Sequence, residues 1–277
     1  MGDILVLLPR SLGQLLNFIY DTLAFHNYGL AIIIFTVIVK LCLLPLTLKQ
    51  FRSSTAMQAL QPQLQELQKR YKNDKQKLQI ETMAFYKENK VNPAGGCLPL
   101  LIQLPILFSL WQVIARPMTY MLGREGEVAG LLAKLPEAER IKGYDELSVV
   151  IHGNILDMNF LGLNLGIVPS FSLDKLFNNP MSSQYLALLI IPILATVTTY
   201  LSSKFMMIGN KGSLNTNTQM ASMNKTMLYV APLMTLVFSF QFPAGLGLYW
   251  IVGYVIQIFQ QLYINKTILK KTEVVSK

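Results

Sequence analysis

A single lysine lies well inside a long apolar run, and its charge is the first clue to function. The run IIIFTVIVKLCLLPLTLKQ, residues 32–50, carries Lys40 nine residues before Lys49. Along a straight helix this spacing places Lys40 about 13 Å from Lys49. An unpaired charge near the centre of a bilayer costs at least about 2.5–3.5 kcal/mol. We therefore expect Lys40 either to extend its stem to the membrane surface, or to face protein and water.

Polar side chains recur at helical spacing in this run and in other apolar runs. Thr36 and Thr47 fall within about 40° of Lys40 on a helical wheel, and Gln103 places an amide in a second apolar run. Further stripes consist of Thr196, Thr199, Ser203, Thr235, Ser239, Trp250, Gln257 and Gln261. Serine and threonine in membrane helices often only bond their own backbone or a neighbouring helix, so each stripe alone is weak support. Together with a charge, the stripes favour a hydrated, positively charged cavity.

Motifs for enzymatic chemistry are absent from the sequence. We find no phosphate-binding loop, no nucleophile elbow and no zinc-protease motif, and His26 and His152 are the two histidines. Cys42 and Cys97 are the two cysteines, and their positions suggest neither a disulfide nor a metal site. No acidic residue lies inside an apolar run to couple a proton or sodium ion, which weakens a secondary transporter. We expect no enzyme, cofactor or metal.

Composition and hydropathy predict an all-α integral membrane protein. The 277 residues are 52% hydrophobic and 14% charged, with a mean hydropathy of +0.40. Five apolar runs reach or nearly reach the length needed to cross a bilayer. They are Tyr28–Leu48, Gly95–Ile114, Tyr185–Ser203, Met227–Phe242 and Leu246–Ile264. Five runs in one chain make a soluble protein with a large helical core an improbable alternative.

The distribution of lysine and arginine predicts the orientation. Residues 49–94 carry nine basic and four acidic residues. Residues 204–226 carry three basic residues and no acidic residue, and residues 265–277 carry four basic residues and one acidic residue. Residues 116–183 instead carry six basic and eight acidic residues. We therefore place the first three segments in the cytoplasm and residues 116–183 outside, with the N-terminus. The net charge of +9 is a topology signal more than a nucleic-acid patch.

Two further helical patterns flank the first span. Residues 12–25 have the spacing of an amphipathic helix, which we place on the outer membrane surface. A second apolar stripe at helical spacing consists of Met57, Leu60, Leu64, Leu67 and Tyr71, and the polar KNDKQK cluster ends it. This pattern predicts a cytoplasmic helical hairpin. Pro62 either opens the first arm of the hairpin or bends it. For residues 159–173 we expect an irregular or hairpin-like excursion.

The chain thus divides into ten segments. They are an outer amphipathic helix (1–27), span one (28–48), the cytoplasmic hairpin (49–94), span two (95–115), the outer loop (116–184), span three (185–203), a cytoplasmic loop (204–226), span four (227–242), span five (246–264) and a cytoplasmic tail (265–277).

Three stretches resemble the YidC family of membrane protein insertases. They are NPAGGCLPLLIQLPILFSLWQVI (92–114), FPAGLGLYWIVGYVIQIFQQ (242–261) and the hairpin LQPQLQELQKRYKNDKQKLQIETMAFYKENKVNP (60–93). The resemblance covers nearly all of residues 28–266 and fails mainly in the outer loop. It implies five helices around a groove that opens to the cytoplasm and to lipid but is closed outside. It also implies a non-catalytic insertase in a bacterial cytoplasmic membrane, in the smaller form of single-membrane bacteria.

The resemblance also implies partners and site residues. Nascent membrane proteins would be the substrates, with the ribosome and the Sec translocon as partners, the hairpin as a recruiting element and lipid as the destination. The candidate groove residues are Lys40, Thr36, Gln103, Trp250, Tyr249 and Gln257. The family's groove charge is usually arginine, so Lys40 keeps the charge but not the planar five-donor fork. The alternatives are a small-anion channel or transporter, with Lys40 binding the anion, and a structural scaffold.

Overall fold

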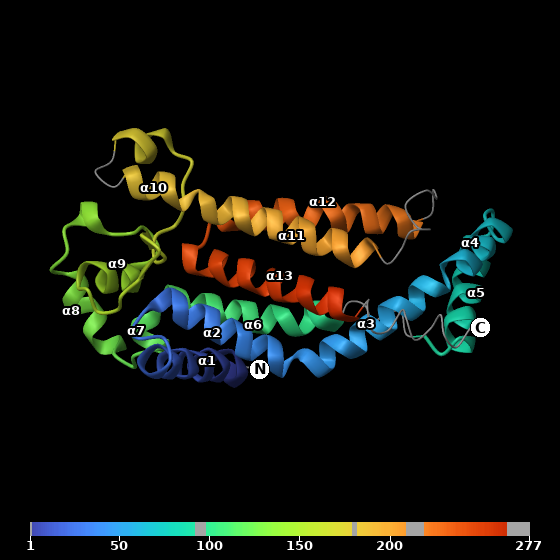
Figure 1. The fold of residues 1–277 in the computed structure, drawn as a ribbon, viewed down its shortest axis with the longest axis horizontal. Helices are drawn as coiled ribbons and strands as arrows, with labels where there is room; N and C mark the ends of the chain where they lie inside the picture. Colours follow the sequence, from blue (N-terminus) through green and yellow to red (C-terminus); the bar gives the residue numbers. More distant parts are fainter. Residues whose placement is uncertain (1, 92–97, 179–181, 209–218, 265–277) are drawn as a thin grey trace.

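The structure, a computed structural model, describes residues 2–91, 98–178, 182–208 and 219–264. Its long helices run side by side along the length of the molecule (Figure 1). One end carries short helices and a two-stranded sheet, and we refer to it as the loop end. The other end carries the two helices α4 and α5, and we refer to it as the hairpin end.

Among the described residues, five long helices correspond to the five predicted apolar runs. They are α2 (Tyr28–Cys42), α6 (Leu98–Ala115), α11 (Ile190–Ile208), α12 (Gln219–Ser239) and α13 (Ala244–Ile264). The helix α13 contacts α2 and α6 on one side and α11 on the other, whereas α12 packs mainly on α11. The helical class predicted from composition is therefore confirmed.

The lengths of these helices support fewer spans than the sequence predicts. Among the described residues, one helix, Ser182–Met206, is long and apolar enough to cross a membrane. The pair Tyr28–Cys42 and Leu44–Ser53 would be a second span despite a bend of 56°, and Gln103–Ala115 and Leu228–Ser239 are shorter apolar helices. The five-span architecture stays a prediction.

A break divides the predicted first span. The helix α2 ends at Cys42, and α3 (Leu44–Ala59) continues in a different direction after Leu43. Pro45, the second residue of α3, has no backbone N–H to donate to the carbonyl of Leu41, and its ring would clash with that carbonyl in a continuous helix. Lys40 consequently lies in the last turn of α2. The straight-helix distance of about 13 Å between Lys40 and Lys49 does not apply, because the bend shortens that path.

The hairpin end consists of α4 (Gln61–Arg70) and α5 (Lys75–Glu88), which pack against each other. The turn between them falls in the KNDKQK cluster, where Asp74 accepts a hydrogen bond from the backbone of Lys77 at 2.9 Å and caps α5. Pro62 lies in the first turn of α4, so it opens this arm and does not bend it.

The N-terminal helix α1 (Gly2–Thr22) packs against α2, α6 and the short helix α7 (Pro117–Tyr120). Leu16 and Ile19 are fully buried, which accounts for the amphipathic pattern. The helix begins ten residues before the predicted start at Leu12 (12 − 2) and continues through Pro9. At Gly13 any side chain would collide with the backbone carbonyl of Tyr120, so glycine lets α1 approach α7 closely.

The loop end contains more regular structure than the sequence indicates. Its elements after α7 are η2 (Glu125–Glu127), α8 (Val128–Leu132), η3 (Glu137–Glu139), α9 (Asp145–His152), β1 (Asn159–Phe160), β2 (Leu163–Asn164), η4 (Asp174–Asn178) and α10 (Ser182–Leu188). The strands are antiparallel, with Phe160 opposite Leu163. Leu161 and Gly162 at the turn both have positive φ, 51° and 80°, as a tight hairpin requires. The hairpin-like excursion is confirmed.

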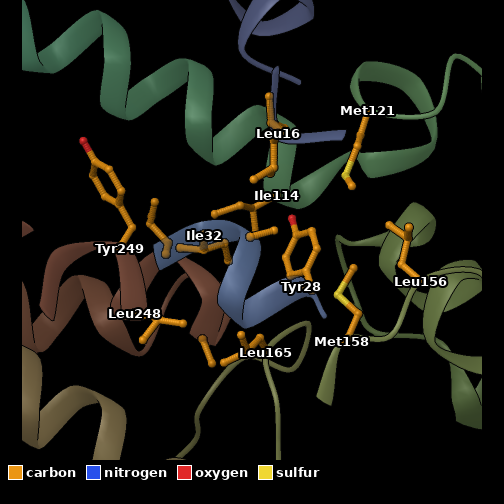
Figure 2. Close-up of a cluster of buried hydrophobic side chains, with 14 of the residues drawn as sticks. Leu16, Tyr28, Ile32, Ile114, Met121, Leu156, Met158, Leu165, Leu248 and Tyr249 are labelled. Atoms are coloured by element: carbon orange, nitrogen blue, oxygen red, sulfur yellow. The ribbon is translucent and has the colours of Figure 1, made fainter. Parts of the chain in front are cut away.

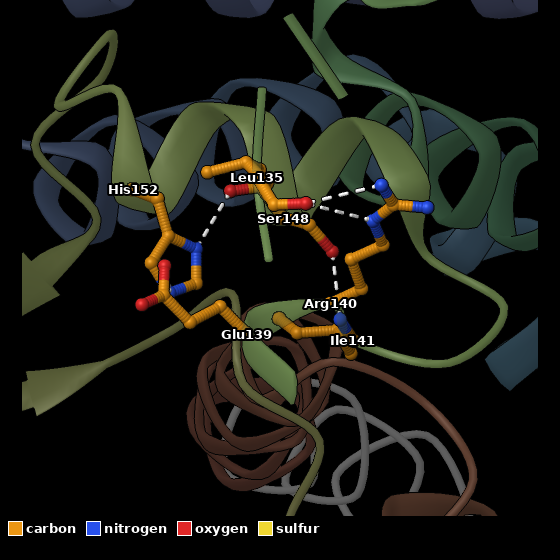
Figure 3. A network of polar contacts seen from close by, with 6 residues as sticks. All are labelled: Leu135, Glu139, Arg140, Ile141, Ser148 and His152. Carbon is orange, nitrogen blue, oxygen red and sulfur yellow. Dashed lines mark hydrogen bonds and ion pairs between the residues drawn. The ribbon is translucent and has the colours of Figure 1, made fainter. Parts of the chain in front are cut away.

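Side-chain hydrogen bonds hold the short loop-end helices together (Figure 3). The Arg140 guanidinium donates to the carbonyls of Leu132 and Leu135, at 3.1 and 3.0 Å, and so caps the end of α8. The Ser148 hydroxyl accepts from the backbone of Ile141 at 2.7 Å. These bonds stabilise short helices that have no long helix to pack along.

The buried core lies towards the loop end (Figure 2). Leu16 of α1, Ile32 of α2, Ile114 of α6 and Leu248 of α13 meet there, and Leu165 joins them from the loop that follows the sheet. This packing of four helices and a loop fixes the positions from which the polar side chains extend.

Candidate functional site

The outer part of the Lys40 side chain lies against the backbone of α13. A Cβ atom added to Gly253 would be 3.3 Å from Lys40 Cε, 3.8 Å from Nζ and 4.0 Å from Thr36 Cγ2. Glycine at this position therefore leaves the space that the ammonium group occupies. Within the described residues, none of the ion pairs involves Lys40. Lys40 thus lies between α2 and α13 with no neutralising carboxylate in the part of the chain that the structure describes.

The hydroxyl of Thr36 is used by its own helix. Thr36 is fully buried, and its Oγ1 donates to the carbonyl of Ile32 at 2.6 Å. Thr47 and Thr196 make the same bond to the carbonyls of Leu43 and Pro192. In each of these three threonines the hydroxyl donates to the backbone carbonyl four residues earlier. These polar stripes are therefore satisfied within their own helices and give little support for a cavity. Thr36 contributes its methyl group to the Lys40 site, not its hydroxyl.

Gln103 and Tyr249 form a hydrogen bond between α6 and α13. Gln103 Nε2 donates to Tyr249 Oη at 2.8 Å, and Tyr249 is only 2% exposed. Figure 2 shows the Tyr249 hydroxyl directed towards α6. The side chains come from positions 146 residues apart, and their pairing holds the two helices together beside the core.

Trp250 and Gln257 lie on α13 on either side of Gly253 in sequence. The Trp250 ring packs edge-on against Phe242, which in turn contacts Trp111, with ring centroids 6.5 and 5.8 Å apart. Gln257 is half-buried and follows Gly253 by one helical turn, so it shares the face that receives Lys40. The structure therefore places Lys40, Thr36 and Gln257 on one side of α13, and Gln103 with Tyr249 as a separate pair.

A third polar group, which includes Tyr254, was not foreseen as a site. Thr199 of α11 donates from Oγ1 to Thr235 Oγ1 of α12 at 3.4 Å, and the Tyr254 hydroxyl of α13 lies close to both. Position 254 is rotated by about 100° from Gly253 on a helix, so it faces a different neighbour. The two threonine stripes were visible in the sequence, but their common partner was not.

The loop end covers the ends of α2 and α13. The backbone N–H groups of Ala244 and Gly245 donate to Ile167 and Leu165 at 2.9 and 2.8 Å, and Tyr28 donates to Asp157 at 3.0 Å. Buried apolar side chains continue from there only as far as Phe35 in α2 and Tyr249 in α13. Lys40 and Gln257 lie beyond this core, towards the hairpin end.

Tyr20 of α1 attaches the loop to the same core. Its hydroxyl accepts a hydrogen bond from the backbone of Asp157 at 3.0 Å, and burial raises the pKa of Tyr20. The side chain therefore stays neutral and bonded at physiological pH. The helices α1, α2 and α13 thus each form hydrogen bonds with the loop.

A cavity of about 350 Å³ lies elsewhere, at the loop end, and includes Arg10, Gln14, Thr119 and Glu125 in its lining. None of the six candidate groove residues lines it. The hydrophilic groove predicted from the sequence is therefore a proposal, which the positions of Lys40 and Gln257 support.

Fold and site together define a helical protein with at least one helix long and apolar enough to cross a membrane, and with a lysine held between two helices beyond a core that loops cover at one end. Comparison with known proteins gives the family. The chain belongs to the 60Kd inner membrane protein family, whose profile matches residues 18–271. This match extends through the loop end, where the motifs in the sequence gave no resemblance.

Several similar proteins are named as insertases. "Membrane protein insertase YidC" of Oceanobacillus iheyensis is 39% identical over 250 residues, which cover 89% of this chain and 77% of that protein. "Membrane protein insertase YidC" of Fusobacterium nucleatum is 35% identical over 92% of this chain and 95% of its own length. "Membrane protein insertase MisCA" of Bacillus subtilis is 35% identical over 94% of this chain and 78% of its own length.

Proposed function

We propose that this protein inserts nascent membrane proteins into a bacterial cytoplasmic membrane without nucleotide hydrolysis. The observation that carries the proposal is the Lys40 ammonium, placed against Gly253 beyond the buried core with no carboxylate partner among the described residues. Family membership and the names of the relatives agree with it. The role is binding and guidance, not catalysis.

The charge gives the site a physical means of acting on a substrate. A cation beside a half-buried amide attracts acidic and polar residues of an incoming chain and lowers the cost of carrying them into the membrane. The covered loop end limits the site to one side of the membrane, so a channel open to both sides is the poorer reading. The membrane potential adds about 2.3 kcal/mol per elementary charge per 100 mV, which drives acidic residues outwards.

The apolar part of the substrate leaves sideways in this proposal. Towards the hairpin end, α2 and α6 expose large apolar side chains, among them Val37, Leu41, Leu104 and Phe108. Such residues face lipid in a spanning protein, and a substrate helix passing along them is transferred from one apolar surface to another. Gln103 and Trp250 lie at the start of this route.

The five spans, the orientation and the partners complete the proposal. The N-terminus and the loop end face outside, and α4, α5 and the C-terminus face the cytoplasm, as the charge distribution favours. The hairpin exposes Lys69, Arg70, Lys72, Lys75 and Lys77, a basic surface suited to a ribosome. It also exposes Ile80 and Met83, which suit an apolar segment of a substrate. We include the Sec translocon as a partner.

Substitution of Lys40 tests the proposal. We expect Lys40→Arg to retain insertion of a single-span substrate with an acidic exported tail, because the charge is kept. Lys40→Ala and Lys40→Glu should reduce it, with Lys40→Glu the more severe, because a carboxylate repels the tail. Insertion is measured by protease protection of the tail in cells depleted of the native protein.

A matched control separates the site from overall charge. Lys49→Glu changes the same charge at an exposed position of α3 and should leave insertion unchanged. If Lys40→Glu inserted the acidic-tailed substrate at the original rate, the role of the cation would be refuted.

A further inference from the structure

An exposed apolar segment precedes α10 at the loop end. Phe171, Leu173 and Phe177 are 62%, 72% and 69% exposed. Leu173 and Phe177 are four residues apart around the single turn η4, so they lie on the same face. Leu176 is buried and attaches the turn to the protein. In water, an exposed cluster of two phenylalanines and a leucine is costly.

The segment lies next to the start of a helix that could span a bilayer. The helix Ser182–Met206, which is long and apolar enough to span a membrane, starts directly after it. In Figure 1 the segment lies beside α10, beyond the start of α11. The side chain of Phe171 also stacks on Phe240 of the α12–α13 connection, with ring centroids 3.8 Å apart. The segment therefore lies beside the first turns of the candidate spanning helix and next to the α12–α13 connection.

The surface of the neighbouring helices continues this apolar patch. Leu186, Ile190 and Ile193 of α10 and α11 are about half exposed, as are Leu233 and Val237 of α12. In a membrane protein such a face meets acyl chains. Two charged residues belong to the segment. Asp174 is exposed, and Lys175 Nζ lies 5.5 Å from the centre of the Tyr185 ring. Aromatic rings and lysines together are typical of the headgroup layer.

We propose that Phe171, Leu173 and Phe177 form an interfacial anchor that enters the lipid leaflet on the loop-end side of the membrane. The partner is the bilayer itself, with acyl chains around the three apolar side chains and headgroups around Lys175. The anchor sets the depth of the helix that follows, and through α11 and α13 the depth of the Lys40 site. The inference goes beyond the insertase function and does not depend on it.

Spin labels on the full chain in vesicles test the anchor. Cys42→Ser and Cys97→Ser remove the native thiols, and Leu173→Cys or Phe177→Cys then carries a nitroxide. The control label is at Ala133→Cys, an exposed loop-end position next to Lys134. The protein is placed in vesicles of phosphatidylethanolamine and phosphatidylglycerol, and collision rates with oxygen and with a water-soluble nickel chelate are compared.

We expect the ratio of oxygen to nickel collisions to be several-fold higher at positions 173 and 177 than at position 133. A label at 177 that collides mainly with nickel lies in water, and that result overturns the anchor. A label protected from both reagents is covered by protein, either a second copy or another partner, and also overturns it. Circular dichroism of each labelled variant shows whether it is folded.

Discussion

At the scale of single residues, the absence of a side chain at position 253 matters as much as the charge at position 40. The sequence showed that Lys40 is unusual, because one cation in an apolar run needs no structure to be noticed. It did not show that Gly253 receives it, since the two residues are far apart in the chain and glycine carries no polarity signal. Thr36 was recognised by type, and its hydroxyl bond to Ile32 is the backbone bond that threonines in membrane helices often make.

Enlarging Gly253 should therefore impair the site without removing its charge. In Gly253→Ala the new Cβ lies 3.3 Å from Lys40 Cε, and a small shift of the lysine side chain relieves this contact. Gly253→Val adds two methyl groups, which displace the ammonium group. A strained rotamer costs about 0.5–1.5 kcal/mol, so we expect a roughly two- to tenfold loss of acidic-tail insertion in Gly253→Val. Gly130→Ala, which meets no atom within 4 Å, is the control. Equal activity of Gly253→Val and the parent would contradict this packing.

At the scale of elements, the pattern of hydropathy predicts the long helices well and their ends poorly. Helical periodicity located the α4–α5 hairpin, because apolar residues recur there every three or four positions. It missed the break at Leu43, since the apolar run continues from α2 into the first turn of α3 and only the backbone effect of Pro45 separates the two helices. The short helices α8 and α9 were missed as well, because neither has a long apolar stripe. Arg140 caps α8, and α9 is held by the burial of Leu147 and Val150.

The bond between α6 and α13 allows a test of helix pairing. Tyr249→Phe leaves the half-buried amide of Gln103 without its acceptor, so we expect a loss of about 0.5–1.5 kcal/mol in the free energy of unfolding. The double variant Tyr249→Phe, Gln103→Leu removes both polar groups and should recover most of that loss. Unfolding in mixed detergent micelles, followed by circular dichroism, measures both. Additive losses in the double variant would show that the two side chains are not coupled.

At the scale of the whole molecule, the two ends differ, and the proposed function depends on this difference. The loop bonds to α1, α2 and α13 and covers the core, whereas the polar residues of α2 and α13 lie beyond that core towards the hairpin end. Charge bias in the sequence predicted two different sides, because lysine and arginine counts depend only on composition. The covering itself depends on backbone bonds between distant segments, such as Gly245 to Leu165, which no sequence pattern encodes.

This asymmetry predicts where a substrate is met. A photoreactive amino acid at Trp250, Gln103 or Gln257 should crosslink to a ribosome-bound nascent membrane protein, because these positions lie at or beyond the edge of the core on its hairpin side. The same group at Leu165, which is fully buried beneath the loop, should give no product. Crosslinks are detected by the mass shift of the radiolabelled nascent chain, and those at position 257 should weaken in Lys40→Glu for a substrate with an acidic tail. Strong crosslinks from Leu165 would mean that the substrate passes through the loop end, as in a channel open to both sides, and would refute a one-sided site.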